Sequence, residues 1–169
     1  MFQVGDKVVH PMHGAGVIDK IVEERISGRT QTYYVFSMPV SGLVLKIPTA
    51  KSHLVGLRSV MDAASASAVI GALDRLDTGE TANWNKRYRE NLDRLKSGDL
   101  YEVARVIKCL MRRDAERGLS TGERKMLHSA KQIFLSEMVL ATGESYQTME
   151  SRLCACMQSG PENEEAASC

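Results

Sequence analysis

The sequence predicts an α+β protein with two domains, a small antiparallel β-barrel followed by a compact all-α helical bundle. Up to about residue 58, short runs rich in Val, Tyr and Thr alternate with turn signals. From residue 59 onward, apolar residues recur every three or four positions, as they do along one face of a helix. The chain has 169 residues, enough for two small domains, and its hydrophobic share of 43% is normal for a core-forming protein.

The first domain, expected over residues 1–58, contains four or five short strands. The strand patterns cover residues 7–10, 16–26, 30–38 and 43–47, and turns marked by Gly, Pro and Ser separate them. Short strands spaced this closely are typical of a small, strongly bent antiparallel barrel. Because a domain of this size has a thin core, we expect it to leave an edge strand open to a partner.

The second domain, expected over residues 59–157, contains four or five helices. The first covers about residues 60–76, and the second begins near Asn83 or Trp84 and stops at Gly98. The later helices are expected at 99–118, 120–143 and 146–157. The remaining segment, residues 158–169, is polar and acidic, and we expect it to be a disordered tail.

Two helix starts carry recognisable capping signals. Ser120 and Glu123 fit a capping box, and Asp99 with Glu102 resembles one, with Asp in the usual Ser/Thr place. The helix that begins after Asp99 has a regular apolar stripe. Its opposite face is predicted to carry a row of basic side chains, Arg105, Lys108 and Arg112.

The net charge of +1 conceals an uneven distribution along the chain. Residues 84–131 hold 13 Lys and Arg against 7 Asp and Glu, whereas residues 132–169 hold 1 against 6. A basic block of this kind points to a polyanionic partner. Solvated helix faces with paired charges would give the same composition, so charge alone leaves both interpretations open.

Nothing in the sequence predicts an enzyme, a cofactor or a metal site. Gly14-Ala15-Gly16 lacks the further glycine and the following helix that a dinucleotide loop requires. His10 and His13 flank a tight turn with no thiol nearby to complete a metal site, so we expect turn or packing roles for them. Cys154 and Cys156 would project to different sides of a helix and could not converge on a metal.

We expect a cytoplasmic protein with reduced thiols. No stretch approaches the ~20 apolar residues that span a bilayer, and the first residues lack the basic start and apolar run of a secretory signal. The four cysteines do not form the framework of a secreted disulfide protein.

Trp84 is the most informative residue for function. It is the only tryptophan, and polar or cationic residues surround it: Asn83, Asn85, Lys86, Arg87, Tyr88 and Arg89. A lone tryptophan at a helix start is commonly a core residue. However, cations that bind phosphates beside a ring that stacks on a base would suit nucleic acid. The cations also oppose the helix dipole, a conflict that a bound phosphate would relieve.

Several motifs occur in an order that resembles a known family. The first half carries Gly5-Asp6-Lys7-Val8-Val9-His10-Pro11-Met12-His13-Gly14-Ala15-Gly16. The second half carries Asn83-Trp84-Asn85-Lys86-Arg87-Tyr88, then Ser97-Gly98-Asp99 with Glu102-Val103-Ala104, then Arg117-Gly118-Leu119-Ser120 through Glu123 to Met126-Leu127. Together, over about residues 2–140, they resemble the CarD-like (CdnL) family of bacterial transcription factors.

The resemblance implies roles for both domains. The first would be a Tudor-like fold, shared with transcription-repair coupling factor, that binds the lobe of the RNA polymerase β subunit. Lys46 matches a basic contact position there; Arg25 is a further candidate, displaced if Glu24 holds its place. The helical domain would contact promoter DNA at the upstream edge of the transcription bubble, with Trp84 as a wedge in the minor groove. The accompanying basic residues are Lys86, Arg87, Arg89, Arg124 and Lys125.

We therefore predict a transcription regulator that binds the RNA polymerase β subunit and promoter DNA together. It would stabilise the open complex without sequence-specific readout and would associate with the nucleoid through polymerase. Two alternatives remain open. One is a protein-only adaptor whose β-domain binds a partner and whose helical domain does not touch DNA. The other is a general nucleic-acid binder unconnected to polymerase.

Overall fold

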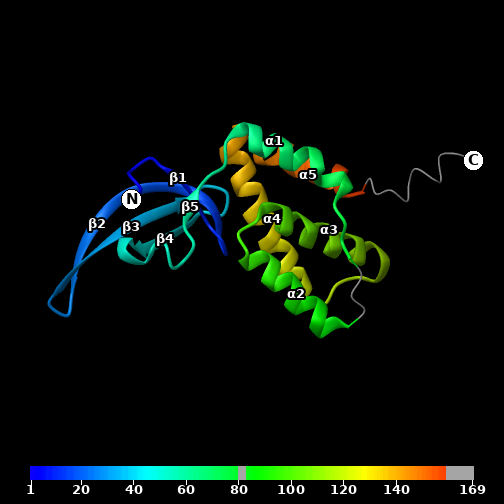
Figure 1. Cartoon of the computed structure of the whole chain (residues 1–169), viewed down its shortest axis with the longest axis horizontal. Helices are drawn as coiled ribbons and strands as arrows, with labels where there is room; N and C mark the ends of the chain where they lie inside the picture. The colour runs from blue at the N-terminus through cyan, green and yellow to red at the C-terminus, as the bar shows by residue number, and fades with distance from the viewer. Residues whose placement is uncertain (80–82, 159–169) are drawn as a thin grey trace, which may run out of the picture.

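A computed structural model describes residues 1–79 and 83–158 of the chain. A β-rich half holds the N-terminus, and a helical half follows it after one connecting segment (Figure 1). Within the described ranges, no helix is both long enough and apolar enough to cross a membrane. Of the expected acidic tail, Gln158 ends the last helix and residues 159–169 lie outside the described residues.

The β-rich half is one antiparallel sheet with the strand order β4-β3-β2-β1-β5. A bulge in β2, between Ile18 and Lys20, adds to its curvature. In the described part of the chain no pairing joins β4 to β5, so the predicted barrel stays an open, bent sheet. The two residues of β5 pair with β1 only and offer β4 no ladder. The strands are β1 (Lys7–His10), β2 (Gly14–Ile26), β3 (Arg29–Met38), β4 (Leu43–Pro48) and β5 (Arg58–Ser59).

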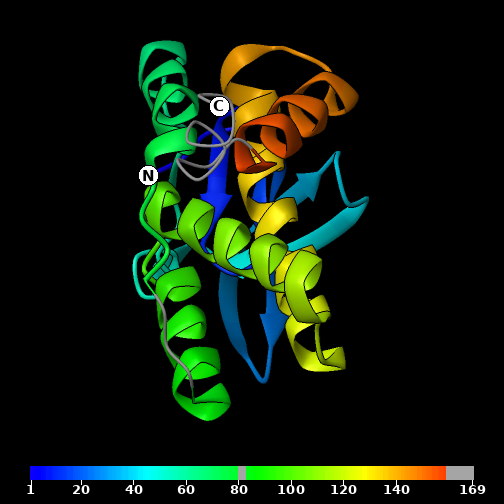
Figure 2. The same ribbon diagram turned by 90° about the vertical axis from the view of Figure 1, so that its right-hand side faces the viewer.

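The helical half packs around one apolar core, as the periodicity predicts. The predicted first helix is shorter than expected, because Asp62 caps its start and the chain tightens into a 3-10 turn, Leu73–Arg75, at its end. Figures 1 and 2 show α4 running through this half beside the sheet. The helices are α1 (Ala63–Ala72), α2 (Trp84–Lys96), α3 (Leu100–Arg117), α4 (Thr121–Thr142) and α5 (Tyr146–Gln158).

Both predicted cap residues begin their helices, but only one of them is part of a capping box. The Ser120 side chain accepts from the Glu123 backbone N–H and the Glu123 carboxylate accepts from the Ser120 N–H, which confirms that capping box. At α3 the Asp99 carboxylate caps the Tyr101 N–H instead. Glu102 pairs with Arg94 and Arg105, so the second predicted box is wrong, because neighbouring cations compete for its carboxylate.

The predicted basic row on α3 is also wrong at one position. Lys108 is almost fully buried, and its ammonium donates to the carbonyls of Leu73 (3.3 Å) and Asp74 (2.8 Å). These carbonyls close the 3-10 turn after α1, where a cation is favoured. Burial, together with the nearby charge of Arg112, lowers the pKa of Lys108. Lys108 thus binds α1 to α3 and does not contribute to a solvated basic face.

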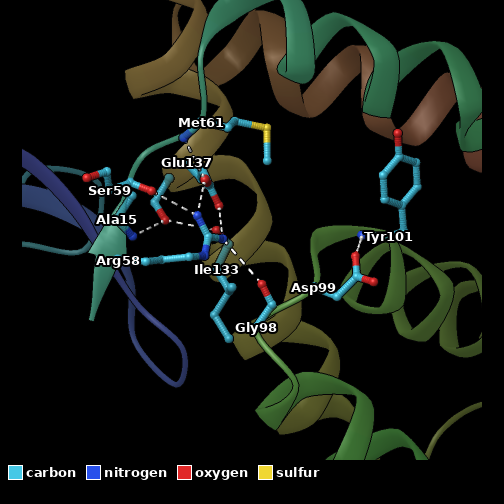
Figure 3. A network of polar contacts seen from close by, with 10 residues as sticks. Ala15, Arg58, Ser59, Met61, Gly98, Asp99, Tyr101, Ile133 and Glu137 are labelled. Atoms are coloured by element: carbon cyan, nitrogen blue, oxygen red, sulfur yellow. Dashed lines mark hydrogen bonds and ion pairs between the residues drawn. The ribbon is translucent and has the colours of Figure 1, made fainter. Parts of the chain in front are cut away.

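A polar junction connects the two halves (Figure 3). The Arg58 guanidinium, at the end of the sheet, donates to both oxygens of Glu137 on α4, at 2.7 and 2.8 Å. Glu137 is fully buried and also accepts from the Met61 N–H at 3.1 Å. Beside it the Ala15 N–H donates to Ser136 Oγ at 2.8 Å.

Gly14 makes this approach possible. Its φ is +104°, and a Cβ there would lie 2.4 Å from Ser136 Oγ. The two halves therefore meet through a close backbone-to-helix contact beside an ion pair whose carboxylate is buried and whose guanidinium is partly exposed.

Candidate nucleic-acid interface

Trp84 is exposed. It is the first residue of α2, after the cap residue Asn83, whose side chain accepts from the Lys86 N–H at 3.2 Å. The Trp84 residue is 43% exposed and is not part of the helical core. Of the two interpretations left open by the sequence, the core residue is therefore wrong, and the ring is available to a ligand.

Tyr88 supports the ring of Trp84. The two rings are stacked, with centroids 5.1 Å apart and planes at 20°. Tyr88 itself is partly buried against the helical core, and its ring carbon would lie 3.5 Å from a Cβ at Gly122. Trp84 therefore rests on a platform that is attached to the start of α4. We did not predict this role for Tyr88 from the sequence, although its spacing of four from Trp84 on a helix could have indicated it.

Exposed cations lie on both helices that carry this platform. Lys86 and Arg89 are exposed on α2, and Lys86 is within 3.9 Å of Glu90, one turn along. Arg124 and Lys125 are exposed in the first turns of α4, directly after the residue that anchors the helix start. Four of the five basic candidates of the helical half thus present their side chains to solvent.

Arg87 differs from the other four. Its guanidinium lies inside the bundle, where Nε and Nη2 donate to Glu123 Oε1 at 3.1 and 2.9 Å. Burial alone would raise the pKa of Glu123, but the hydrogen bonds from Arg87 and from the Ser120 backbone outweigh it and lower that pKa. The expectation that Arg87 meets a phosphate does not fit this geometry, because its donors face a buried carboxylate. Sequence spacing could not reveal a partner 36 residues away.

The candidate polymerase contacts lie on the sheet. Lys46, on β4, forms an ion pair across β3 with Glu24 on β2, and both side chains are partly exposed. Arg25 is exposed near the hairpin between β2 and β3, which points away from the helices (Figure 1). The edge strand β4 presents Leu43 and Val44 to solvent. Lys46 and Arg25 thus both belong to the sheet, Lys46 on its edge strand and Arg25 beside the β2–β3 hairpin.

The two histidines near the first turn pack on each other. The rings of His10 and His13 have centroids 4.6 Å apart, and the His10 Nδ1 accepts from the Met12 N–H at 3.2 Å. Burial, followed by the charge of His13, lowers the pKa of His10. Within the described residues no group of three or more His, Cys, Asp or Glu side chains could hold a metal ion.

Two family models cover most of the chain in the order that the motifs predict. The model described as the CarD-like/TRCF RID domain matches residues 2–61, and the model described as CarD, C-terminal domain, matches residues 68–154. The chain belongs to the CarD-like family. A relative, "Putative transcription factor YdeB" of Bacillus subtilis (strain 168), is 34% identical over 151 residues, which are 89% of this chain and 99% of the relative.

Membership gives the fold and the general function. The CarD-like family consists of transcription regulators, and its first domain is Tudor-like, which agrees with the bent five-stranded sheet of this chain. The predicted α+β architecture and the predicted family are thereby confirmed. The polymerase contact, the DNA contact and the residues that make them belong to the proposal below.

Proposed function

We propose that this CarD-like regulator binds the RNA polymerase β subunit and promoter DNA together, and stabilises the open complex at the upstream edge of the bubble. The observation that carries the proposal is the exposed Trp84 ring, stacked on Tyr88 and accompanied by exposed cations on α2 and α4. An apolar ring of this kind can insert between bases, while Lys86, Arg89, Arg124 and Lys125 bind the phosphates on either side.

The geometry favours a wedge over a sequence reader. Phosphate contacts carry no sequence code, and a single ring against a base step distinguishes bases poorly. A wedge stabilises the open state only to the extent that it binds the open fork better than closed duplex. A differential affinity of about 1.4 kcal/mol would shift the open–closed ratio tenfold. We therefore expect the protein to act on many promoters and to leave no operator sequence.

The sheet would supply the contact with RNA polymerase. β4 is an edge strand whose free backbone groups can add a partner strand, and the side chains of Leu43, Val44 and Lys46 would then decide which strand fits. Arg25 would add a charge at the hairpin end. Tethering to polymerase raises the effective concentration of the DNA-binding half near the fork, so a weak grip on DNA becomes sufficient.

The test of the wedge is the lifetime of the open complex with the full-length protein. Trp84→Ala should bind polymerase as before and shorten the lifetime toward the value without the protein, whereas Trp84→Phe should retain part of the effect. Tyr101→Ala is the matched control, because Tyr101 is an aromatic residue of similar exposure at the start of α3. An unchanged lifetime with Trp84→Ala would defeat the wedge.

The protein-only adaptor is the second candidate, and the exposed edge of β4 alone would support it. Crosslinking to promoter DNA from α2 and the start of α4, weakened by added salt, would count against the adaptor. Lys46→Glu in the full chain should reduce capture of polymerase, because it places a second acid beside Glu24. Intact capture would remove Lys46 from the polymerase contact.

A further inference from the structure

A buried ion cluster joins the first turns of α2 and α4. Arg87 and Glu123 form it, with side chains only 6% and 3% exposed, and Arg113 Nε approaches the same Glu123 oxygen at 3.9 Å. Removing charges from water is costly, and an apolar pair of similar size would often stabilise the fold as well. The cluster differs from an apolar contact in one respect: its hydrogen bonds have direction and fix how the two helices are rotated.

The carboxylate of Glu123 is held on both sides. Oε1 accepts from Arg87, while Oε2 accepts from the Ser120 N–H at 3.3 Å as part of the capping box. One side chain therefore fixes the start of α4 and, at the same time, the first turns of α2. Glu123 cannot change rotamer without releasing one of these two helix ends.

Arg87 is well placed to act on the exposed tryptophan. It lies three residues after Trp84 and directly precedes Tyr88, whose ring lies close to Gly122 at the start of α4. If Arg87 were released, α2 could rotate or fray at its first turn, and Tyr88 would leave its place over Gly122. Trp84 would then lose the surface on which it stacks.

We propose that Arg87 and Glu123 are positioning residues for Trp84: their buried pair holds α2 against α4 so that the Trp84–Tyr88 stack is formed before DNA arrives. The expected effect of this pair on promoter binding rests on the proposed function, in which Trp84 contacts DNA. Arg87 acts through Trp84 and does not itself bind phosphate. A ring that is already ordered loses less conformational entropy on insertion, which increases the affinity for the fork.

The direction in which one substitution changes DNA affinity shows whether Arg87 positions Trp84 or contacts a phosphate itself. Glu123→Gln removes a buried negative charge near the proposed DNA-binding face and keeps an oxygen for the Ser120 cap. If Arg87 were a phosphate ligand, this change would free its guanidinium and tighten binding to a forked promoter duplex. If Arg87 is a positioning residue, Glu123→Gln weakens binding, and so does Arg87→Met. Glu102→Gln is the control, since it removes an acid from α3 that has no bond to α2's first turn.

The single tryptophan provides a readout in the free protein, without polymerase or DNA. In Arg87→Met we expect acrylamide to quench Trp84 fluorescence more strongly than in the wild type, because the ring leaves Tyr88. Far-ultraviolet circular dichroism and a cooperative urea transition check that the variant is folded, and Arg87→Lys serves as a milder variant if it is not. Unchanged quenching in a folded variant that has lost the ion pair would overturn the proposal.

A double-mutant cycle links the pair to the wedge. Arg87→Met should shorten the open-complex lifetime by about the factor found for Trp84→Ala, and the combined variant should be no worse than Trp84→Ala alone. Effects that multiply would show that Arg87 acts independently and would refute the proposal. If Trp84→Ala itself has no effect on lifetime, the wedge fails, while the quenching result still decides whether the pair positions the ring.

Discussion

Glu137 holds the sheet and the helices together, and its substitution should be costly. Glu137→Gln keeps the size of the side chain but replaces one oxygen by an NH2 group that faces the Arg58 guanidinium. The carboxylate accepts three hydrogen bonds, two from Arg58 and one from the Met61 N–H. Breaking a buried ion pair by removal of one partner costs about 3–5 kcal/mol when the remaining charge is also buried.

The remaining charge is not fully buried in this case. The Arg58 side chain is 37% exposed, so water can hydrate it after the pair is broken. We therefore expect a smaller loss in the free energy of unfolding, about 2–3 kcal/mol, close to the value of one charge-assisted hydrogen bond. Urea unfolding followed by circular dichroism would measure it, and an unchanged m-value would show that the transition still includes both halves.

Ser136→Ala is the natural comparison for this measurement. It leaves the ion pair intact and removes the Ser136 hydroxyl, which accepts from the Ala15 N–H and donates to the Ile133 carbonyl at 3.1 Å, so the loss should be about 1–2 kcal/mol. If Glu137→Gln lowers the free energy of unfolding by less than Ser136→Ala does, the ion pair does not hold the junction. Packing between β2 and α4 must then account for the stability of the junction.

Three further predictions concern local interactions. Ser120→Ala should lower the free energy of unfolding by about 1 kcal/mol through loss of the α4 cap, measured by urea denaturation. Because its partners hold the pKa of Glu123 below the ordinary 4.5, the stability that this carboxylate contributes should be complete above that value and lost as the pH falls through the lowered pKa. The Glu123→Gln variant should lack this pH-dependent loss of stability. Identical acid-unfolding curves for the variant and the wild type would contradict the prediction. Because burial and Arg112 lower the pKa of Lys108, the unfolded chain binds more protons than the folded chain between that lowered pKa and the ordinary 10.5. The wild type should therefore gain stability as the pH rises through the lowered pKa toward 10.5, and Lys108→Met should not, as thermal melts across that range would show.

Helix ends were predictable from the sequence where the signal is local. Ser120 with Glu123 marks the start of α4, and the glycines at 118 and 143 follow the ends of α3 and α4, because caps involve residues within one turn of each other. The Asp99 site shows the limit of such signals. Its Glu102 finds Arg94 on the preceding helix, and no pattern within one helix anticipates that competition.

Buried charges were not predictable for a related reason. Arg87 and Lys108 each have a sequence neighbourhood that suits a solvated face, and each is buried because of a partner about 35 residues away. The same holds for closure of the sheet, which depends on how far β5 can pair and not on the strand patterns themselves. The exposed position of Trp84 could be inferred only in part, since its polar neighbours indicate solvent while its size favours a core.

The junction at Glu137 and the anchor at Glu123 lie on the same helix, 14 residues apart in the sequence of α4. At 1.5 Å per residue, that distance is about 21 Å. A tilt of about 10° at the junction would therefore move the other end by nearly 4 Å, which exceeds the 3.4 Å rise of one base step in B-DNA. In the proposed complex with polymerase and DNA, helix α4 would therefore act as a lever with its pivot at the sheet, and the stiffness of that pivot would determine which base step Trp84 reaches.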